Sequence, residues 1–374
     1  MEHRNDWDPR ADAVQIDQIS AYDELRQRCP VAHSDFLGWS LLNHHDAMTA
    51  LLDHEVYSSQ VSRHVAVPNG MDPPEHTAYR AIIDRCFTAQ FVDDFAPALR
   101  RLAEDLIPAA LELDIMADLA LPYAARAQCA YLGWPQSAAT ALQTWAEQSA
   151  PATLRGDREE LERVAKQFDE IIVENLRTDR PGPVITGLRS ERVAGQPLTD
   201  AQIVSIVRNW TAGELGTIAA AVGIIVGFLA QHPQEQQLLR ERPALRQPAM
   251  DEILRLDAPL IADRRRTAVP VTASGRDIPA DEPVTILWPA VQRDPARFDA
   301  ADQFRLDRDP RDNLLYGRGV HYCPGEGLAR LELGVFLDEF LHAIPAFELV
   351  AAQRAGYPSG GFRALRVRAV SDPV

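Results

Sequence analysis

The feature that most constrains the fold is a single helical stretch of 36 residues at 198–233, which reads LTDAQIVSIVRNWTAGELGTIAAAVGIIVGFLAQHP. It opens with Thr199, a residue type that caps helix N-termini. At 1.5 Å per residue this helix would be about 50 Å long, enough to cross the whole molecule. Its longest apolar run, 218–230, is shorter than the roughly 20 residues that span a bilayer. We therefore predict a buried core helix and no membrane contact.

Most of the remaining chain also has apolar residues at helical spacing. Strand signals are few: a hairpin is expected around Gly275, and an edge strand at 364–370. A long Asp- and Pro-rich segment at 292–314 has little periodicity, and a stretch of that length usually has a function. We predict a mainly α fold with a small β component, as one domain over 1–374. The clearest helical stretches besides the long one are 45–57, 75–87, 95–111, 157–177, 249–256 and 327–344.

Composition excludes several classes of function. The net charge of −16 argues against a nucleic-acid partner, because phosphate binding needs clustered cations. The four cysteines have neither paired metal-ligand spacing nor the density of a disulfide scaffold. The first 14 residues are polar and acidic, unlike a signal peptide. We expect a cytoplasmic protein.

One cysteine has unusual surroundings. In LLYGRGVHYCPG, 314–325, Cys323 follows two glycines, Gly317 and Gly319, and precedes a third, Gly325. Glycines allow the backbone to approach a flat partner closely, and the helix that follows favours a thiolate at its N-terminus. From these residues alone, a buried structural cysteine, a nucleophile and a metal ligand are all open. No second or third ligand stands nearby, which disfavours zinc and leaves an axial thiolate to haem iron.

The sequence YGRGVHYCPG resembles the haem-binding loop of the cytochromes P-450, whose signature is an aromatic residue followed by Gly-x-Gly-x-His/Arg-x-Cys-x-Gly. The resemblance continues over nearly the whole chain, with separate motifs in the family's order. It implies the cytochrome P-450 fold, a triangular helical body with haem b between the long central helix and the cysteine loop with its following helix. It also makes Cys323 the axial ligand of the haem iron.

A second motif, EILR, supplies Glu252 and Arg255 one turn apart on one helix face. Taken alone, this is an ordinary surface pair. The resemblance implies instead that the pair is buried and joined by Arg308, as a structural network.

Other residues match positions that bind the haem propionates in the family. His76 and Arg80 are four residues apart on one helix, and arginine is well shaped for a carboxylate. The resemblance adds His321 and Arg265, with Arg266 the alternative if the register slips by one residue.

The long helix departs from the family pattern. The positions that normally hold an acid and an alcohol for proton delivery hold Leu215 and Gly216. Glu214 and Thr217 flank them and are three residues apart, so they share a helix face. We predict Glu214 and Thr217 as the catalytic residues, brought into use by a local bulge; water or the substrate itself are the alternative proton path.

The resemblance implies a monooxygenase that inserts one oxygen atom of O2 into a small organic substrate by hydroxylation or O-demethylation. A ferredoxin and its reductase would supply electrons, and we expect a monomer. The positive charge of Arg85, Arg318 and Arg330 would suit docking of an acidic donor, with ordinary surface charge as the alternative. A peroxide-using or diverted haem-thiolate enzyme is the alternative, and a non-catalytic haem-binding protein is less favoured. Trp210 is predicted either to line the substrate pocket or to pack in the core.

Overall fold

The structure is a computed structural model that describes residues 5–62, 66–108, 112–178 and 181–370. The chain divides into two compact units. Unit 1 consists of Met1–Thr77, Asp251–Cys323 and Arg354–Gly360, and unit 2 of Ala78–Met250, Pro324–Gln353 and Gly361–Val374. Each unit is described separately below, and the expectation of one functional domain without a fused redox partner stays a prediction.

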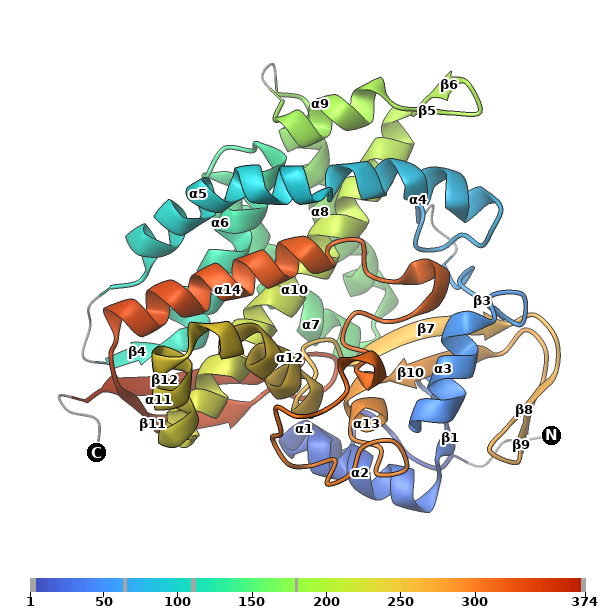
Figure 1. Ribbon diagram of the computed structural model, residues 1–374. Helices are drawn as coiled ribbons and strands as arrows, with labels where there is room; N and C mark the ends of the chain where they lie inside the picture. Colours follow the sequence, from blue (N-terminus) through green and yellow to red (C-terminus); the bar gives the residue numbers. More distant parts are fainter. Residues whose placement is uncertain (1–4, 63–65, 109–111, 179–180, 371–374) are drawn as a thin grey trace. The chain divides into compact units, whose positions relative to one another are not determined.

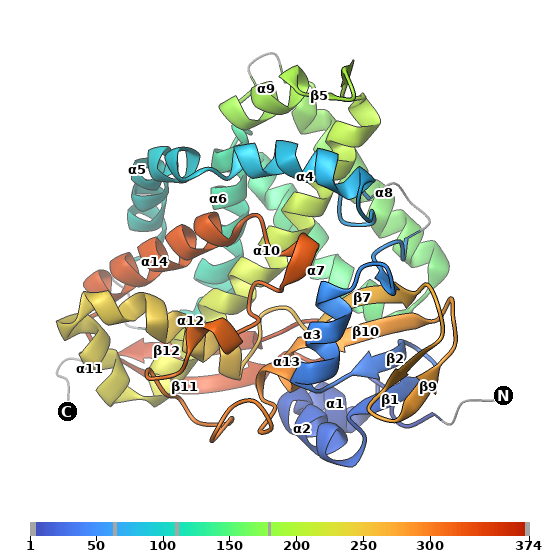
Figure 2. The same ribbon diagram turned by 45° about the vertical axis from the view of Figure 1, so that its right-hand side comes forward.

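Unit 1 contains the larger sheet, whose strand order is β1-β2-β10-β7-β3 (Figure 2). Strand β10 is parallel to β2 and antiparallel to β7, with Val284 opposite Arg265. Apolar residues of this sheet, among them Trp39 and Ile286, pack with Leu51 of α3 into one buried cluster. The elements of unit 1 are α1 (Asp12–Ile16), α2 (Gln18–Arg28), β1 (Val31–Ser34), β2 (Gly38–Leu41), α3 (His44–Leu52), β3 (Tyr57–Ser58), β7 (Ala262–Thr267), β8 (Val271–Ala273), β9 (Arg276–Ile278), β10 (Pro283–Leu287), α13 (Trp288–Gln292) and two 3-10 turns, Pro310–Asp312 and Gly319–His321.

The predicted hairpin around Gly275 is confirmed. Strands β8 and β9 pair antiparallel, with Ala273 opposite Arg276. The two residues between them, Ser274 and Gly275, both have positive φ, at 44° and 77°. This is the backbone that a two-residue hairpin needs to match the twist of its strands.

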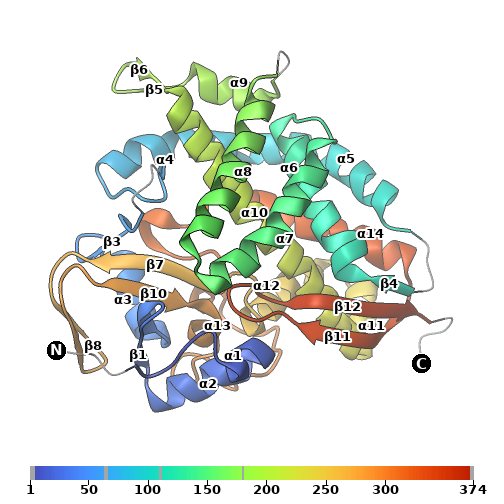
Figure 3. The ribbon, with the colours of Figure 1, turned by 180° about the vertical axis from the view of Figure 1, so that it is seen from behind.

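Unit 2 is a helical assembly around α10 (Asp200–Gln231), with α6, α7 and α8 visible together in Figure 3. Helix α14 runs alongside α5 and also contacts α10 (Figure 1). Its other elements are α5 (Ala89–Leu106), β4 (Glu112–Asp114), a π-helical turn at Ile115–Ala120, α6 (Leu121–Leu132), α7 (Ala138–Arg155), α8 (Arg158–Leu176), α9 (Pro183–Ser190), β5 (Arg192–Val193), β6 (Gln196–Pro197), α11 (Pro233–Glu241), a 3-10 turn at Pro243–Leu245, α14 (Glu326–Ala343), β11 (Phe347–Arg354) and β12 (Phe362–Ala369). Two helices, α4 (Glu75–Cys86) and α12 (Arg246–Leu256), begin in one unit and end in the other, and the last residue of β11, Arg354, belongs to unit 1.

The long helix is confirmed and starts where the sequence predicts. Thr199 is its N-cap, and Thr199 and Gln202 form a reciprocal capping box. The helix is α-helical without interruption from Asp200 to Gln231, so it contains no local bulge at 211–217. By length and composition α10 could cross a membrane, but 67% of its apolar window is buried inside the protein, as in a core helix.

The prediction of an edge strand near the C-terminus is wrong in one respect. Strand β12 is the middle strand of a three-stranded sheet, in the order β11-β12-β4. Its partner β4 is only three residues long and therefore carries no periodicity that a sequence pattern can detect. The sequence pattern for that reason did not show that β12 has a strand on each side.

Candidate functional site

The cysteine loop of unit 1 depends on its glycines. Gly317 and Gly319 have φ values of 73° and 75°, in the left-handed region that side chains disfavour. A Cβ at Gly319 would lie 2.2 Å from the carbonyl oxygen of Leu51, so only glycine lets the loop pack against the end of α3. The backbone N–H of Cys323 donates to the carbonyl of Tyr316 at 2.9 Å, which closes the loop. Cys323 is partly exposed and is not in a disulfide.

Three basic side chains gather in the same unit. The rings of His76 and His321 lie 4.3 Å apart between centroids, and a ring nitrogen of His321 is 3.1 Å from the carbonyl oxygen of Met71. Burial, reinforced by the nearby His76 and Arg265, lowers the pKa of His321 to about 4. Each of these basic groups makes it harder for its neighbours to carry a positive charge. A bound anion would offset this repulsion, so the three side chains are suited to bind one. We refer to His76, Arg265 and His321 as the basic cluster.

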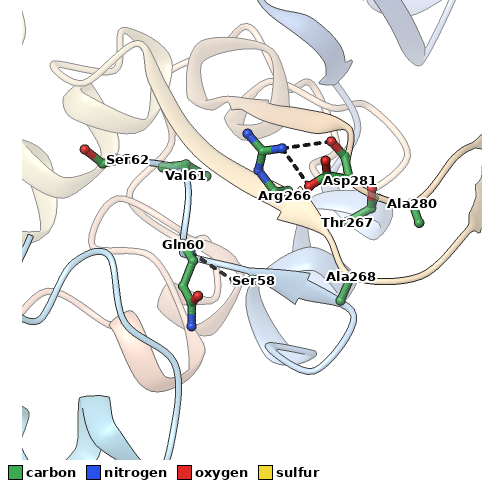
Figure 4. A pocket seen from close by; sticks show the side chains of 9 residues that line it. All are labelled: Ser58, Gln60, Val61, Ser62, Arg266, Thr267, Ala268, Ala280 and Asp281. Carbon is green, nitrogen blue, oxygen red and sulfur yellow. Dashed lines mark hydrogen bonds and ion pairs between the residues drawn. The ribbon is translucent and has the colours of Figure 1, made fainter. Parts of the chain in front are cut away.

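The structure distinguishes Arg265 from Arg266, the two alternatives for a propionate ligand. Arg265 is 4% exposed, contributes to the basic cluster and pairs with Asp263 at 2.9 Å. Arg266 points to the other face of β7 and pairs with Asp281 at 2.7 Å. There it lines an open pocket of about 450 Å³ with Ser58, Gln60, Val61, Ser62, Thr267, Ala268, Ala280 and Asp281 (Figure 4). Alternation of side chains along a strand separates the two arginines, and we favour Arg265.

We expect Arg265→Leu to weaken haem retention roughly 10- to 100-fold, because one hydrogen bond to a charged group is worth about 1.5–3 kcal/mol. The measurement is the rate of haem loss to a haem-scavenging protein. Arg266→Leu is the matched control from the same strand and should change this rate less than twofold. Equal effects of the two substitutions would contradict the choice of Arg265.

Arg80 lies one turn beyond His76 on α4, within unit 2. Its Nε donates to Asp84 at 2.6 Å, and its side chain is 18% exposed. Its predicted propionate contact stays a prediction.

The predicted network of Glu252, Arg255 and Arg308 is confirmed within unit 1. Arg255 is 1% exposed and forms a bidentate pair with Glu252 at 2.7 and 2.9 Å. Arg308 donates to the same carboxylate at 2.8 Å. Both arginines also donate to backbone carbonyls of the aperiodic segment, at Gln292, Asp299, Ala300, Ala301 and Gln303. Backbone carbonyls outside a helix or sheet need other donors, and the two arginines supply them. The function of the aperiodic segment is therefore to accept these hydrogen bonds and complete the network.

In unit 2, α10 has an open face in its middle. Ala212, Gly213 and Gly216 are exposed although the helix around them is buried. A Cβ added at Gly213 or Gly216 would meet nothing within 4 Å. The hydroxyl of Thr217 lies at the edge of this open face and donates to the carbonyl of Gly213 at 2.7 Å.

Glu214 lies on the opposite side of α10. Its side chain is only 9% exposed and meets Gln128 of α6 and Glu332 of α14. The structure therefore does not bring the Glu214 carboxyl to the open face with the Thr217 hydroxyl. Sequence reasoning missed Gln128 and Glu332, because only packing of the three helices brings them together. The catalytic roles of Glu214 and Thr217 stay predictions.

Trp210 is partly buried and packs against two aromatic side chains, and both alternatives for it, pocket lining and core packing, stay predictions. Its ring centre is 4.2 Å from that of Phe87 and 5.7 Å from that of Tyr131. Its side chain also hydrogen-bonds to Glu214, one turn along α10.

Comparison with known proteins identifies the family. The model of the cytochrome P450 family matches residues 153–350, slightly more than half of the chain. The chain belongs to this family. It is therefore a monooxygenase of the bacterial type and an oxidoreductase that uses haem iron.

Individual P450 relatives cover almost all of the chain. It is 29% identical over 375 residues to the cyclomarin C epoxidase CymV of Salinispora arenicola (strain CNS-205), over 92% of this chain and 94% of that protein. It is 26% identical over 381 residues to the 6-deoxyerythronolide B hydroxylase of Saccharopolyspora erythraea, over 91% and 92%. A solved mutant of P450 EryK in complex with erythromycin B has a TM-score of 0.86 at 25% identity, covering 95% of this chain and 97% of that chain. The predicted fold class, mainly α with a small β component, is thus confirmed.

The described residues of this P450 fit a haem. A cysteine thiolate is an established axial ligand of haem iron, and Cys323 stands partly exposed on a glycine-shaped loop. The basic cluster matches carboxylates in charge and hydrogen-bonding capacity.

Proposed function

We propose that this P450 uses Cys323 as the axial iron ligand and inserts one oxygen atom of O2 into a small organic molecule. Hydroxylation and O-demethylation are the reactions proposed from the sequence, and the epoxidase among its relatives adds epoxidation. The observation that carries this proposal is the glycine-shaped loop that presents Cys323, in the same compact unit as the basic cluster. When bound, haem with a thiolate ligand supplies the chemistry that activates dioxygen.

The chain's own residues would divide the other tasks. Cys323 would hold the iron, while His76, Arg265 and His321, with Arg80, would bind the carboxylates at the haem edge. Ala212, Gly213 and Gly216 would leave room for the substrate beside α10. Thr217 is the hydroxyl nearest that open face and would hold a proton there.

Helices α7 and α8 are joined by only Gly156 and Asp157, so they form a helical hairpin with a short connection.

The electron donor is proposed to be a ferredoxin, in keeping with bacterial P450s generally. In unit 2, two of the arginines expected at the docking surface are paired with carboxylates: Arg85 with Glu191 at 2.6 Å, and Arg330 with Glu326 at 3.0 Å. These pairs reduce the local positive charge that would attract an acidic partner. A weak, salt-sensitive association is therefore expected. We further propose a monomer in the cytoplasm.

One observation favours a second candidate function, a peroxide-using P450. The open face of α10 offers Ala212, Gly213, Gly216 and Thr217 but no carboxyl group, and the Thr217 hydroxyl is already bonded to a backbone carbonyl. An enzyme without an acid at this face is poorly equipped to deliver protons to oxygen. Peroxide brings the protons and electrons that the O2 route must obtain separately.

The experiment that tests the proposal begins with optical titration of the ferric holoenzyme against a panel of aromatic, terpenoid, fatty-acid and peptide-like compounds. A compound that changes the spin state is then turned over in two ways: with O2, ferredoxin, its reductase and a reduced nicotinamide, or with hydrogen peroxide alone. We expect oxygenated product by the O2 route, with much of the nicotinamide consumed without product. Product from peroxide and none from O2 would replace the proposed function by the second candidate, and no product by either route would overturn both.

A further inference from the structure

Unit 2 contains two buried carboxyl groups that face one another across a helix interface. Glu332 of α14 is 0% exposed and Glu214 of α10 is 9% exposed. The two carboxyls interact, although neither oxygen of Glu332 has hydrogen-bond geometry to any donor among the described residues. An ionised carboxyl in such a place is costly unless it is paired or well hydrogen-bonded. The two groups therefore need a specific explanation.

Glu214 is surrounded by donors. In the amide orientation that satisfies both of its neighbours, Gln128 accepts from the Thr211 hydroxyl at 2.7 Å and donates to both Glu214 oxygens, at 2.6 and 3.0 Å. Trp210 hydrogen-bonds to the same carboxyl. A neutral Glu214 would direct its own hydroxyl proton toward one of these donors, so the arrangement suits a carboxylate.

Glu332 has the opposite surroundings. The groups that face the pair from α6 are Tyr123, Cys129 and Tyr131, and burial raises the pKa of each, so that all are neutral. The Tyr123 hydroxyl donates to the backbone carbonyl of Glu332, at 2.8 Å, and not to its side chain. The charged residues nearest in sequence on α14 and α10 form ion pairs of their own: Arg330 with Glu326, and Arg208 with Asp169 of α8.

We propose that Glu214 and Glu332 hold one proton between them, with Glu332 as the neutral acid that donates and Glu214 as the carboxylate that accepts. Glu332 is thereby a positioning residue. Through Glu214 it fixes the rotation of α10, so that Ala212, Gly213 and Gly216 form the open face on the other side of the helix. This role goes beyond the proposed function, because it assigns Glu214 to the helix interface and adds a residue that the sequence pattern did not indicate.

The directions of the pKa shifts of Glu214 and Glu332 agree with this geometry. Burial raises the pKa of Glu214 to about 8, while hydrogen bonds from Glu332 and Trp210 hold it down. The Gln128 bonds favour the ionised form as well. Burial and the adjacent Glu214 raise the pKa of Glu332 well above its usual range. The pair therefore holds two protons below a pH of about 8. It loses the first from Glu214 near that pH and keeps the second on Glu332, which gives the one-proton state.

Infrared spectroscopy of the holoenzyme tests the proposal directly. At a pH of about 9 exposed carboxyl groups are ionised, so a remaining carbonyl band of a protonated carboxylic acid reports a buried acid. We expect one such band in the wild type, its disappearance in Glu332→Gln and a shifted band in Glu214→Gln. Glu104→Gln, an exposed position on α5, is the matched control and should leave the band unchanged.

The proposal is overturned if the wild type has no such band at this pH, because both groups would then be ionised. It is also overturned if the band survives Glu332→Gln. The wild-type spectrum decides the first point even if a variant fails to fold. Neither outcome depends on substrate turnover, so failure here is distinguishable from failure of the proposed function.

A second measurement uses stability. In the unfolded chain both carboxyls would ionise near their usual pKa of 4.5, whereas the folded pair retains protons to higher pH. The native state then binds more protons above pH 4.5, and its free energy of unfolding falls as the pH rises toward about 8 and beyond. Glu332→Gln still offers Glu214 an N–H donor, so we expect it to fold and to flatten this decline. A decline as steep as in the wild type would contradict the proposal.

Discussion

Cys323→Ser is expected to abolish oxygenation while leaving the chain folded. A serine hydroxyl is a poor ligand for haem iron and does not supply the electron density that a thiolate does. Turnover should fall by more than the roughly 10- to 100-fold that loss of a supporting group around a metal costs. The measurements are the carbon monoxide difference spectrum, in which the thiolate-ligated form should vanish, and product formation with the substrate found by titration.

Cys29→Ser is the control for this substitution. Cys29 is a partly exposed cysteine of unit 1, like Cys323, and neither is in a disulfide. Its thiol donates to the carbonyl of Val31, a bond that a serine hydroxyl can replace. The Cys29→Ser substitution should leave the carbon monoxide difference spectrum and the turnover unchanged. Retention of the thiolate spectrum in Cys323→Ser would contradict both the assignment of Cys323 and the proposed function.

Arg255→Leu is expected to cost about 3–5 kcal/mol of the free energy of unfolding, because it leaves the buried Glu252 carboxylate without its main partner. Arg255 also supplies donors to three backbone carbonyls of the aperiodic segment. The expected loss is a large part of the roughly 5–15 kcal/mol that stabilises an ordinary domain. Urea unfolding followed by circular dichroism measures it.

Arg158→Leu provides the comparison, since Arg158 forms an ion pair with Glu162 at 2.9 Å while 89% exposed. Removal of this exposed pair should change stability by less than about 1 kcal/mol. If Arg255→Leu does not fold, Arg255→Lys keeps the charge but not the bidentate geometry and should show an intermediate loss. Similar, small effects at Arg255 and Arg158 would contradict the structural importance of the network.

The site illustrates which kinds of residue a sequence pattern can find. The cysteine loop and the Glu252–Arg255 pair were recognised because their members are close in sequence, where spacing fixes geometry. Arg308 was also predicted, because the resemblance to the family implies that it joins the Glu252–Arg255 pair. The middle position of β12 was missed, because its partner β4 is too short to show a period.

Glu214 shows the limit of the same reasoning. The spacing of Glu214 and Thr217 places them near one another on the helix surface, but spacing alone does not say which side of α10 is buried. The structure directs Glu214 toward Gln128 and Glu332 and leaves Thr217 at the open face. No local pattern connects Gln128, Glu214 and Glu332, which come from three separate helices.

The family, the long helix with its Thr199 cap, the cysteine that would hold the iron and the local motifs around it could all be predicted from the sequence. These features depend on residues that are neighbours along the chain. The packing of the whole chain separated Arg265 from Arg266 on the two faces of β7, set Trp210 against Phe87 and brought Glu214 to Glu332. Those outcomes depend on which face of a strand or helix is buried, and burial is a property of the whole packed chain.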